Sequence, residues 1–235
     1  EEIGERRNFL VRPPVANLDL LLVVVSITEP EPNQLLMDKT IAIAEKNEVE
    51  PVIVITKADL KDTRQLAEIY RKSGFEVFEV SSKTGQGIGE LKKRLTGFLS
   101  VLSGNSGVGK SSLLNALEPS YGLETGQISK KLGRGRHTTR TAEIFKLSCG
   151  ARIADTPGFS TIDIERVQRI YKDELAGCFR EFKDYLGGCR FTSCSHTVET
   201  GCAVIDAVNS GKIAPQRYDS YKAIYGEVKD LKTWD

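Results

Sequence analysis

A phosphate-binding loop is the feature that most constrains how this chain can fold. Residues 104–111 read Gly-Asn-Ser-Gly-Val-Gly-Lys-Ser, which matches the pattern G-x4-G-K-[ST]. An apolar segment, residues 98–102, precedes the loop, and a helical pattern continues from Ser112 to Leu117. The motif therefore lies between a predicted strand and a predicted helix, as a working phosphate loop requires. This context predicts an α/β domain.

Each residue type in the loop suits a specific step in binding a nucleotide. Glycines allow backbone N–H groups to curl around phosphate oxygens at the start of a helix. Lys110 would reach the β and γ phosphates and act in catalysis, and Ser111 would supply an oxygen to Mg2+. The predicted nucleotide-binding residues of this segment are Asn105, Ser106, Gly107, Val108, Gly109, Lys110, Ser111 and Ser112.

A second element, Asp155-Thr156-Pro157-Gly158, follows a short predicted strand and matches D-x-x-G. Asp155 would hold Mg2+ through a water molecule, and the Gly158 N–H would contact the γ-phosphate. Taken alone, this tetrapeptide is an ordinary turn. Beside a phosphate loop it indicates a nucleotide switch.

A third element indicates which base is bound. Thr56-Lys57-Ala58-Asp59 follows the apolar strand at residues 51–55, and Thr56 stands where Asn is more usual. The Asp59 carboxylate can accept hydrogen bonds from N1–H and the amino group of guanine, whereas adenine offers an acceptor at N1. The stem of Lys57 would lie along the purine, and Ser81-Ser82-Lys83 resembles the turn whose N–H contacts the guanine O6. We predict GTP binding, which disfavours an ATP-using enzyme.

The order of these elements indicates a circular permutation. In an ordinary small GTPase the base-reading elements follow the phosphate loop, whereas here residues 56–59 and 81–83 precede it. Compact domains tolerate cuts in loops, so a permutation explains the order without changing the site. The D-x-x-G switch then leads directly into the residues after 165.

The apolar pattern divides the chain into three parts. Between residues 20 and 102, apolar runs alternate with amphipathic stretches, which is typical of a parallel sheet covered by helices. Strand patterns stop near residue 162, and residues 216–232 form an amphipathic helical pattern. We predict a linker at residues 1–16, a permuted P-loop GTPase domain at 17–164 and a small, mostly helical domain at 165–235.

Four potential metal ligands lie close together in the third part: Cys189, Cys194, His196 and Cys202. Three thiolates and one imidazole can fill a closed tetrahedral zinc site, so the metal would be structural. The spacing is not the common C-x2-C, and buried free thiols remain an alternative explanation at this point.

Composition adds exclusions. Lys and Arg (33) nearly cancel Asp and Glu (32), so net charge does not by itself indicate a nucleic-acid partner. The longest apolar run, residues 20–25, is far too short for a membrane span, and no signal-peptide pattern opens the chain. We expect a cytoplasmic monomer without a membrane partner.

Together, these motifs and their order resemble the circularly permuted, small-subunit ribosome biogenesis GTPases of the RsgA/YjeQ family. The resemblance extends over nearly all 235 residues and includes Arg136-His137-Thr138-Thr139. It implies a GTPase that binds the small ribosomal subunit and its rRNA late in maturation, with hydrolysis stimulated by that particle. It also implies one structural Zn2+ in the cysteine cluster and an N-terminal OB-fold before the linker.

Residues 130–140 are the expected switch loop, and they contain a candidate catalytic residue. Residues 130–140 carry several Lys and Arg and no acid, which is typical of a solvated loop or of RNA phosphate contact. Thr139 is the predicted Mg2+ ligand of this loop. The residue after D-x-x-G is Phe159, which cannot orient water as the usual Gln does, so we expect slow intrinsic turnover. His137 is the predicted replacement.

Two other functions remain as alternatives. The chain could be a GTP-dependent switch for a non-ribosomal protein effector. Alternatively, the cysteine-rich domain could be a nucleic-acid module that the nucleotide only regulates.

Overall fold

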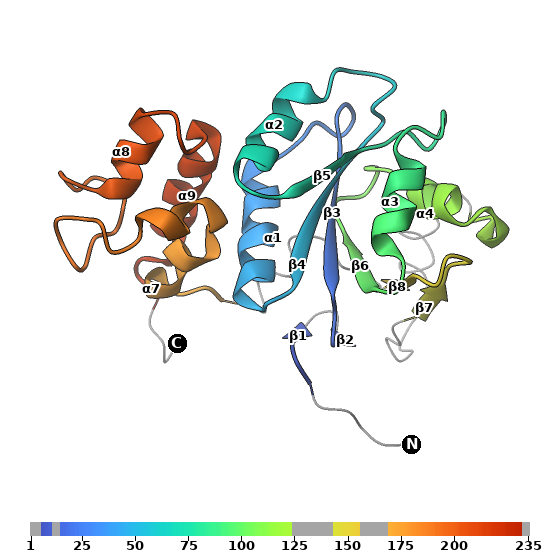
Figure 1. The fold of residues 1–235 in the computed structure, drawn as a ribbon, viewed down its shortest axis with the longest axis horizontal. Helices are drawn as coiled ribbons and strands as arrows, with labels where there is room; N and C mark the ends of the chain where they lie inside the picture. The colour runs from blue at the N-terminus through green and yellow to red at the C-terminus, as the bar shows by residue number, and fades with distance from the viewer. Residues whose placement is uncertain (1–5, 11–14, 124–142, 156–168, 232–235) are drawn as a thin grey trace.

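The computed structural model describes residues 6–10, 15–123, 143–155 and 169–231 (Figure 1). Its centre is a six-stranded sheet in the order β5-β4-β3-β6-β8-β7. All neighbours pair in parallel except β7 and β8, which pair antiparallel. The strands are β3 (Leu20–Ser26), β4 (Glu50–Thr56), β5 (Glu76–Glu79), β6 (Leu99–Ser103), β7 (Glu143–Lys146) and β8 (Arg152–Asp155).

Helices cover both faces of the sheet because the central strands are apolar on both sides. In β3, Leu21, Val23 and Val25 belong to one core cluster, and the alternate residues belong to the other. The first cluster lies under α1 (Gln34–Lys46) and α2 (Arg64–Lys72), and the second under α3 (Ile88–Leu95) and α4 (Lys110–Leu117). The expected α/β sheet is confirmed.

The C-terminal part is helical, as predicted, and packs against α1 (Figure 1). Its elements are short except for the last helix, which begins with a proline, a residue suited to a first turn. That helix ends at Val228, not at residue 232, and Tyr218, Tyr221 and Ile224 of its predicted apolar stripe are buried. The elements are α7 (Lys172–Leu175), η2 (Ala176–Cys178), η3 (Arg180–Tyr185), α8 (Ala203–Asn209) and α9 (Pro215–Val228).

A buried ion-pair network joins α9 to α1. The Arg217 side chain is 1% exposed, and it donates from Nη1 to Asp38 at 2.6 Å and from Nε to Glu181 at 2.7 Å. The Tyr70 hydroxyl, from α2, donates to Asp38 at 3.0 Å. Burial lowers the pKa of Arg217, but the Asp38 and Glu181 carboxylates raise it further, so the guanidinium stays charged. Four elements thus meet at one arginine.

The remaining short elements lie at the margins of the sheet. The strands β1 (Phe9–Leu10) and β2 (Val15–Ala16) pair antiparallel inside the predicted linker, and η1 (Pro119–Tyr121) follows α4. The predicted boundary near residue 165 lies outside the described residues. Within the described ranges, every helix is too short or too polar to cross a membrane.

Candidate functional site

The segments predicted to bind the nucleotide lie together at the carboxyl ends of the strands. The phosphate loop leaves the carboxyl end of β6, Lys57 follows β4, Ser81 lies just beyond β5, and Asp155 ends β8. In a parallel sheet all of these ends lie along the same edge. The β3 and β6 strands are neighbours although residues 27–98 separate them in the chain, and the order of the strands reverses between them. Ligands of open α/β sheets bind at such a switch point.

Two glycines give the phosphate loop its shape. A side chain at Gly104 would collide with the carbonyl oxygen of Val24 on the adjacent strand, so only glycine fits there. Gly109 has a φ of +95° at the N-cap of α4, a left-handed conformation that favours glycine. The loop therefore turns tightly from β6 into the start of α4, where free N–H groups attract phosphate.

Lys110 and Ser111 occupy the first turn of α4. The Lys110 ammonium reaches back to the carbonyl oxygens of Gly104 and of Asn105, the latter at 2.8 Å. The Lys110 side chain therefore folds back over the first residues of the phosphate loop. Ser111 is buried, and Ser112 is half-buried beside it. The roles predicted for the two residues, at the phosphates and at Mg2+, stay predictions.

Two adjacent side chains of the predicted base-reading turn, residues 56–59, bond to two adjacent carbonyl groups of the phosphate loop. Thr56 donates from Oγ1 to the Val108 oxygen at 2.6 Å, and Lys57 donates from Nζ to the Gly107 oxygen at 3.2 Å. In a trans peptide the N–H points away from the C=O. Because these two carbonyls point toward the turn, the N–H groups of Val108 and Gly109 point away from it.

The rest of the base-reading turn is open to solvent on one side. Lys57 has a φ of +59°, and the N–H of Ala58 bonds to Val80 at 3.1 Å, which joins the turn to the end of β5. Asp59 is exposed, so its carboxylate is accessible to a ligand. The turn presents Asp59 outward while its preceding residues face the loop.

Ser81 shapes the neighbouring turn. Its side chain is fully buried, and its Oγ accepts from the N–H groups of Lys83 at 3.3 Å and Thr84 at 3.1 Å. Ser82 is half-buried. The hydroxyl of Ser81 thus fixes the backbone from which a guanine contact is predicted.

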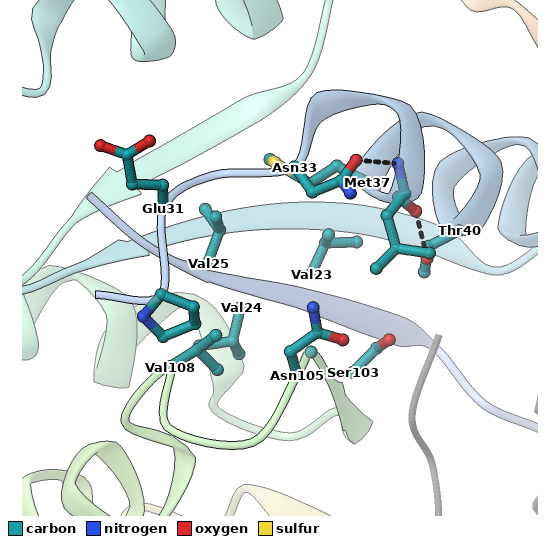
Figure 2. A pocket seen from close by; sticks show the side chains of 13 residues that line it. Val23, Val24, Val25, Glu31, Asn33, Met37, Thr40, Ser103, Asn105 and Val108 are labelled. Carbon is teal, nitrogen blue, oxygen red and sulfur yellow. Dashed lines mark hydrogen bonds between the residues drawn. The ribbon is translucent and has the colours of Figure 1, made fainter. Parts of the chain in front are cut away.

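A small cavity separates the phosphate loop from α1 (Figure 2). It measures about 30 Å3, and the polar side chains of Ser103, Asn105 and Thr40 line it. Ser103 is fully buried, and its Oγ has no hydrogen-bond partner among the described residues. The size and polarity of the cavity suit one ordered water molecule.

Several predicted residues cannot be placed in this site. Gly158, Phe159, His137 and Thr139 lie outside the described residues, as does the basic loop at 130–140. Asp155 is described as the last residue of β8, beside Ala154, which pairs in register with Val101 of β6. The D-x-x-G element therefore begins next to the strand that carries the phosphate loop.

The four predicted metal ligands come together as a second site. Their ligand atoms all lie within 4.8 Å of one another. The sulfur atoms of Cys189 and Cys202 are 3.8 Å apart, and each lies 3.4 Å from Nδ1 of His196. A tetrahedron with metal–sulfur bonds of about 2.3 Å has edges of about 3.8 Å, so the spacing fits a closed tetrahedral ion. The alternative of unrelated buried thiols does not explain this convergence.

The chemistry of the donors also favours a cation. Burial, and then the neighbouring thiols of Cys202 and Cys189, raise the pKa of Cys194 to about 12, so this thiol ionises at neutral pH only beside a positive charge. Burial lowers the pKa of His196, which keeps the imidazole neutral and able to ligate. A metal ion would supply the missing charge and deprotonate the thiols.

The loop between the second and fourth ligands is held by residues that motif reading missed. The Glu199 carboxylate accepts from the N–H groups of Ser195 at 2.7 Å and of Thr197 and Val198 at 3.1 Å each. Burial alone would raise the pKa of Glu199, but the hydrogen bonds from Ser195 and the backbone lower it to about 2. A Glu in a polar loop gives no sequence signal of this role.

Comparisons with known proteins agree with this geometry. The RsgA GTPase family model matches residues 3–165. A "Small ribosomal subunit biogenesis GTPase RsgA" from Caldanaerobacter subterraneus subsp. tengcongensis is 47% identical over 232 residues, which cover 97% of this chain and 77% of that protein. The protein of the same name from Geobacillus kaustophilus is 45% identical, covering 98% of this chain and 80% of the relative.

Solved structures give the same result. The crystal structure of YjeQ from Thermotoga maritima aligns with a TM-score of 0.83 at 40% identity, over 99% of this chain and 79% of that one. The structure of YloQ, described as a circularly permuted GTPase, aligns with a TM-score of 0.78 at 34% identity, over 98% of this chain and 75% of that one. The order of the elements is therefore a shared permutation.

Proposed function

This chain belongs to the RsgA GTPase family, and on that premise we propose that it hydrolyses GTP during late maturation of the small ribosomal subunit. The observation that carries the proposal is the joining of the base-reading turn to the phosphate loop through Thr56 and Lys57. These contacts support a single site in which Asp59 would read guanine and the loop would cradle the phosphates. Binding to the subunit and its rRNA would then depend on which nucleotide fills the site.

The chain's own residues can carry out most of the binding chemistry. The N–H groups of Val108 and Gly109 would hold phosphate oxygens, and Lys110 would exchange its carbonyl contacts for the β and γ phosphates. Ser111 and Thr139 would hold Mg2+ directly, and Asp155 through water. That ion would neutralise charge on the β and γ oxygens. Asp59 would read guanine, with Gly158 at the γ-phosphate.

The attacking water must be oriented for hydrolysis, and we assign this step to a side chain whose position depends on the ribosomal particle. Phe159 has no hydrogen-bonding atom, so it cannot orient water. We propose that His137 does so once the ribosomal particle orders its loop, which would make intrinsic hydrolysis slow and stimulated hydrolysis fast. Replacing His137 with Ala should then remove the stimulation. An unchanged stimulated rate would contradict this role.

The metal cluster is proposed to hold one structural Zn2+. Three sulfurs and one nitrogen at tetrahedral spacing suit Zn2+, and all four positions are filled by protein. We propose that this ion stabilises a domain of residues 165–235 beside a GTPase domain of 17–164, after a linker of 1–16. The protein would act as a cytoplasmic monomer, since ribosomal subunits mature in that compartment.

Co-sedimentation with purified small subunits tests the proposal. We expect the protein to pellet with small subunits in the presence of a non-hydrolysable GTP analogue, and to be released with GDP. Large subunits serve as the control. GTP binding without nucleotide-dependent association with small subunits would instead favour a switch for a non-ribosomal effector. Association by residues of the cysteine-rich part, indifferent to the nucleotide, would favour a separate nucleic-acid module.

A further inference from the structure

His196 is held in an unusual backbone conformation inside the metal cluster. Its φ is +57°, in the left-handed region that residues other than glycine rarely adopt. The side chain is buried, and its Nδ1 points at the sulfurs of Cys189 and Cys202, 3.4 Å from each. Contacts that hold this backbone conformation therefore also fix the direction of the imidazole.

The residues on either side of His196 are each fixed at both backbone groups. Ser195 donates its N–H to Glu199 at 2.7 Å, and its carbonyl accepts from the Tyr221 hydroxyl at 2.8 Å. Thr197 donates its N–H to Glu199 at 3.1 Å, and its carbonyl accepts from the Tyr218 hydroxyl at 3.1 Å. The two flanking peptides are thus held between one carboxylate and one face of α9.

Glu199 is the centre of this arrangement. One oxygen serves Ser195, and the other serves both Thr197 and Val198. Both oxygens point at backbone N–H groups, so the carboxylate is not placed to coordinate an ion itself. Hydrogen bonds to an ionised carboxylate are stronger than those between neutral groups. Three such bonds link Glu199 to the backbone of the loop at residues 194–199, which carries the ligands Cys194 and His196.

We propose that Glu199 is a positioning residue for the metal site, whose hydrogen bonds hold the loop so that Cys194 and His196 keep the geometry in which they bind the ion. The four ligand atoms lie within 4.8 Å of one another, and the bonds to Glu199 fix the backbone on both sides of His196. The proposal rests on the metal assignment, not on GTP hydrolysis. The tyrosines hold the same loop from the other side and give an independent variant.

The test is the affinity of the full chain for Zn2+, measured by competition with a chromogenic chelator. Loss of an outer-shell contact typically lowers metal affinity 10- to 100-fold, and we expect about this loss for Glu199→Gln. Gln has the same shape, so the variant should fold, and Glu199→Ala should lose more. The paired change Tyr218→Phe and Tyr221→Phe should weaken affinity in the same direction.

Asp206→Asn is the matched control, because Asp206 is an exposed acid at the start of α8, four residues after the last ligand. It removes an equal charge close to the site but touches no loop N–H. We expect near-wild-type affinity for this control. An equal loss in both variants would show a general charge effect and overturn the proposal, as would unchanged affinity in Glu199→Gln.

Co2+ spectra separate positioning from ligation. If Glu199 only positions the ligands, Co2+-loaded Glu199→Gln should keep the wild-type absorption of a tetrahedral thiolate site at saturation. A changed spectrum would make Glu199 a ligand and contradict the proposal. A wild-type chain that binds neither ion would overturn the metal assignment itself, whereas loss of GTP hydrolysis alone would leave both standing.

Discussion

The Thr56 hydroxyl lies 2.6 Å from the carbonyl oxygen of Val108 and thereby joins the turn after β4 to the loop after β6. The two strands are not neighbours, because β3 lies between them. The contact crosses the end of β3 and connects the turn predicted to read the base with the loop predicted to cradle the phosphates. It therefore fixes the position of one element relative to the other.

Thr56→Val tests this connection. Valine keeps the shape but leaves the buried Val108 carbonyl without its donor, which costs about 1 to 1.5 kcal/mol. We expect GDP and GTP to bind roughly 5- to 10-fold more weakly, as measured by titration with fluorescent nucleotides. Thr56→Ser should restore binding. Thr96→Val is the control, since that hydroxyl bonds only within its own helix turn at Lys92. Wild-type affinity in Thr56→Val would refute the connection.

Asp59→Asn should change the base preference. The variant can accept only one of the two guanine hydrogen bonds, and a bond to a charged group contributes about 1.5 to 3 kcal/mol. GTP affinity should fall roughly 10- to 100-fold, and xanthosine triphosphate should bind more tightly than it does to wild type. Competition titrations with both nucleotides measure this. Unaltered preference would mean that another group reads the base.

Arg217→Met should strongly destabilise the protein. It leaves Asp38 and Glu181 buried without their shared cation, and removing one partner of a buried pair costs about 3 to 5 kcal/mol. Urea unfolding followed by circular dichroism measures the loss. Arg64→Met, which breaks an exposed pair with Asp62, should cost less than about 1 kcal/mol. Equal effects would show that the network does not hold α9 to α1.

Stability should also fall in acid through Glu79. Burial would raise the pKa of this carboxyl, but hydrogen bonds from Thr63 and Arg71 lower it below the usual 4.5. A folded-state pKa below the unfolded one adds stability above about pH 4.5, and this is lost as the pH falls through the folded value. Wild type should therefore exceed Glu79→Gln in free energy of unfolding at pH 7, and the difference should shrink below about pH 4.5. A pH-independent difference would contradict this.

Sequence reasoning identified the motifs because their chemistry depends on residue type and spacing. These local patterns are the phosphate loop, the turn at residues 56–59 and the four predicted metal ligands. Apolar runs that alternate with amphipathic stretches predicted the sheet, which brings the loop and the turn together. The permuted order was also visible, since it is a property of the chain itself. The structural relatives share it.

Other features depend on contacts between distant segments, which a sequence does not display. Thr56 lies in the predicted base-reading turn, and its hydroxyl also bonds to the phosphate loop, because β4 and β6 end on either side of β3. Arg217 belongs to an amphipathic helix in which a charged residue is normally exposed, but it is buried by partners from α1 and η3. Glu199, in contrast, contacts only its near neighbours in the chain, but a Glu in a polar loop carries no pattern that indicates this role.

The decisive measurement is the rate of GTP hydrolysis with and without purified small ribosomal subunits. We expect slow turnover by the protein alone and a large acceleration by small subunits, with no acceleration by large subunits and no hydrolysis of ATP. The same slow rate with every ribosomal particle would contradict it.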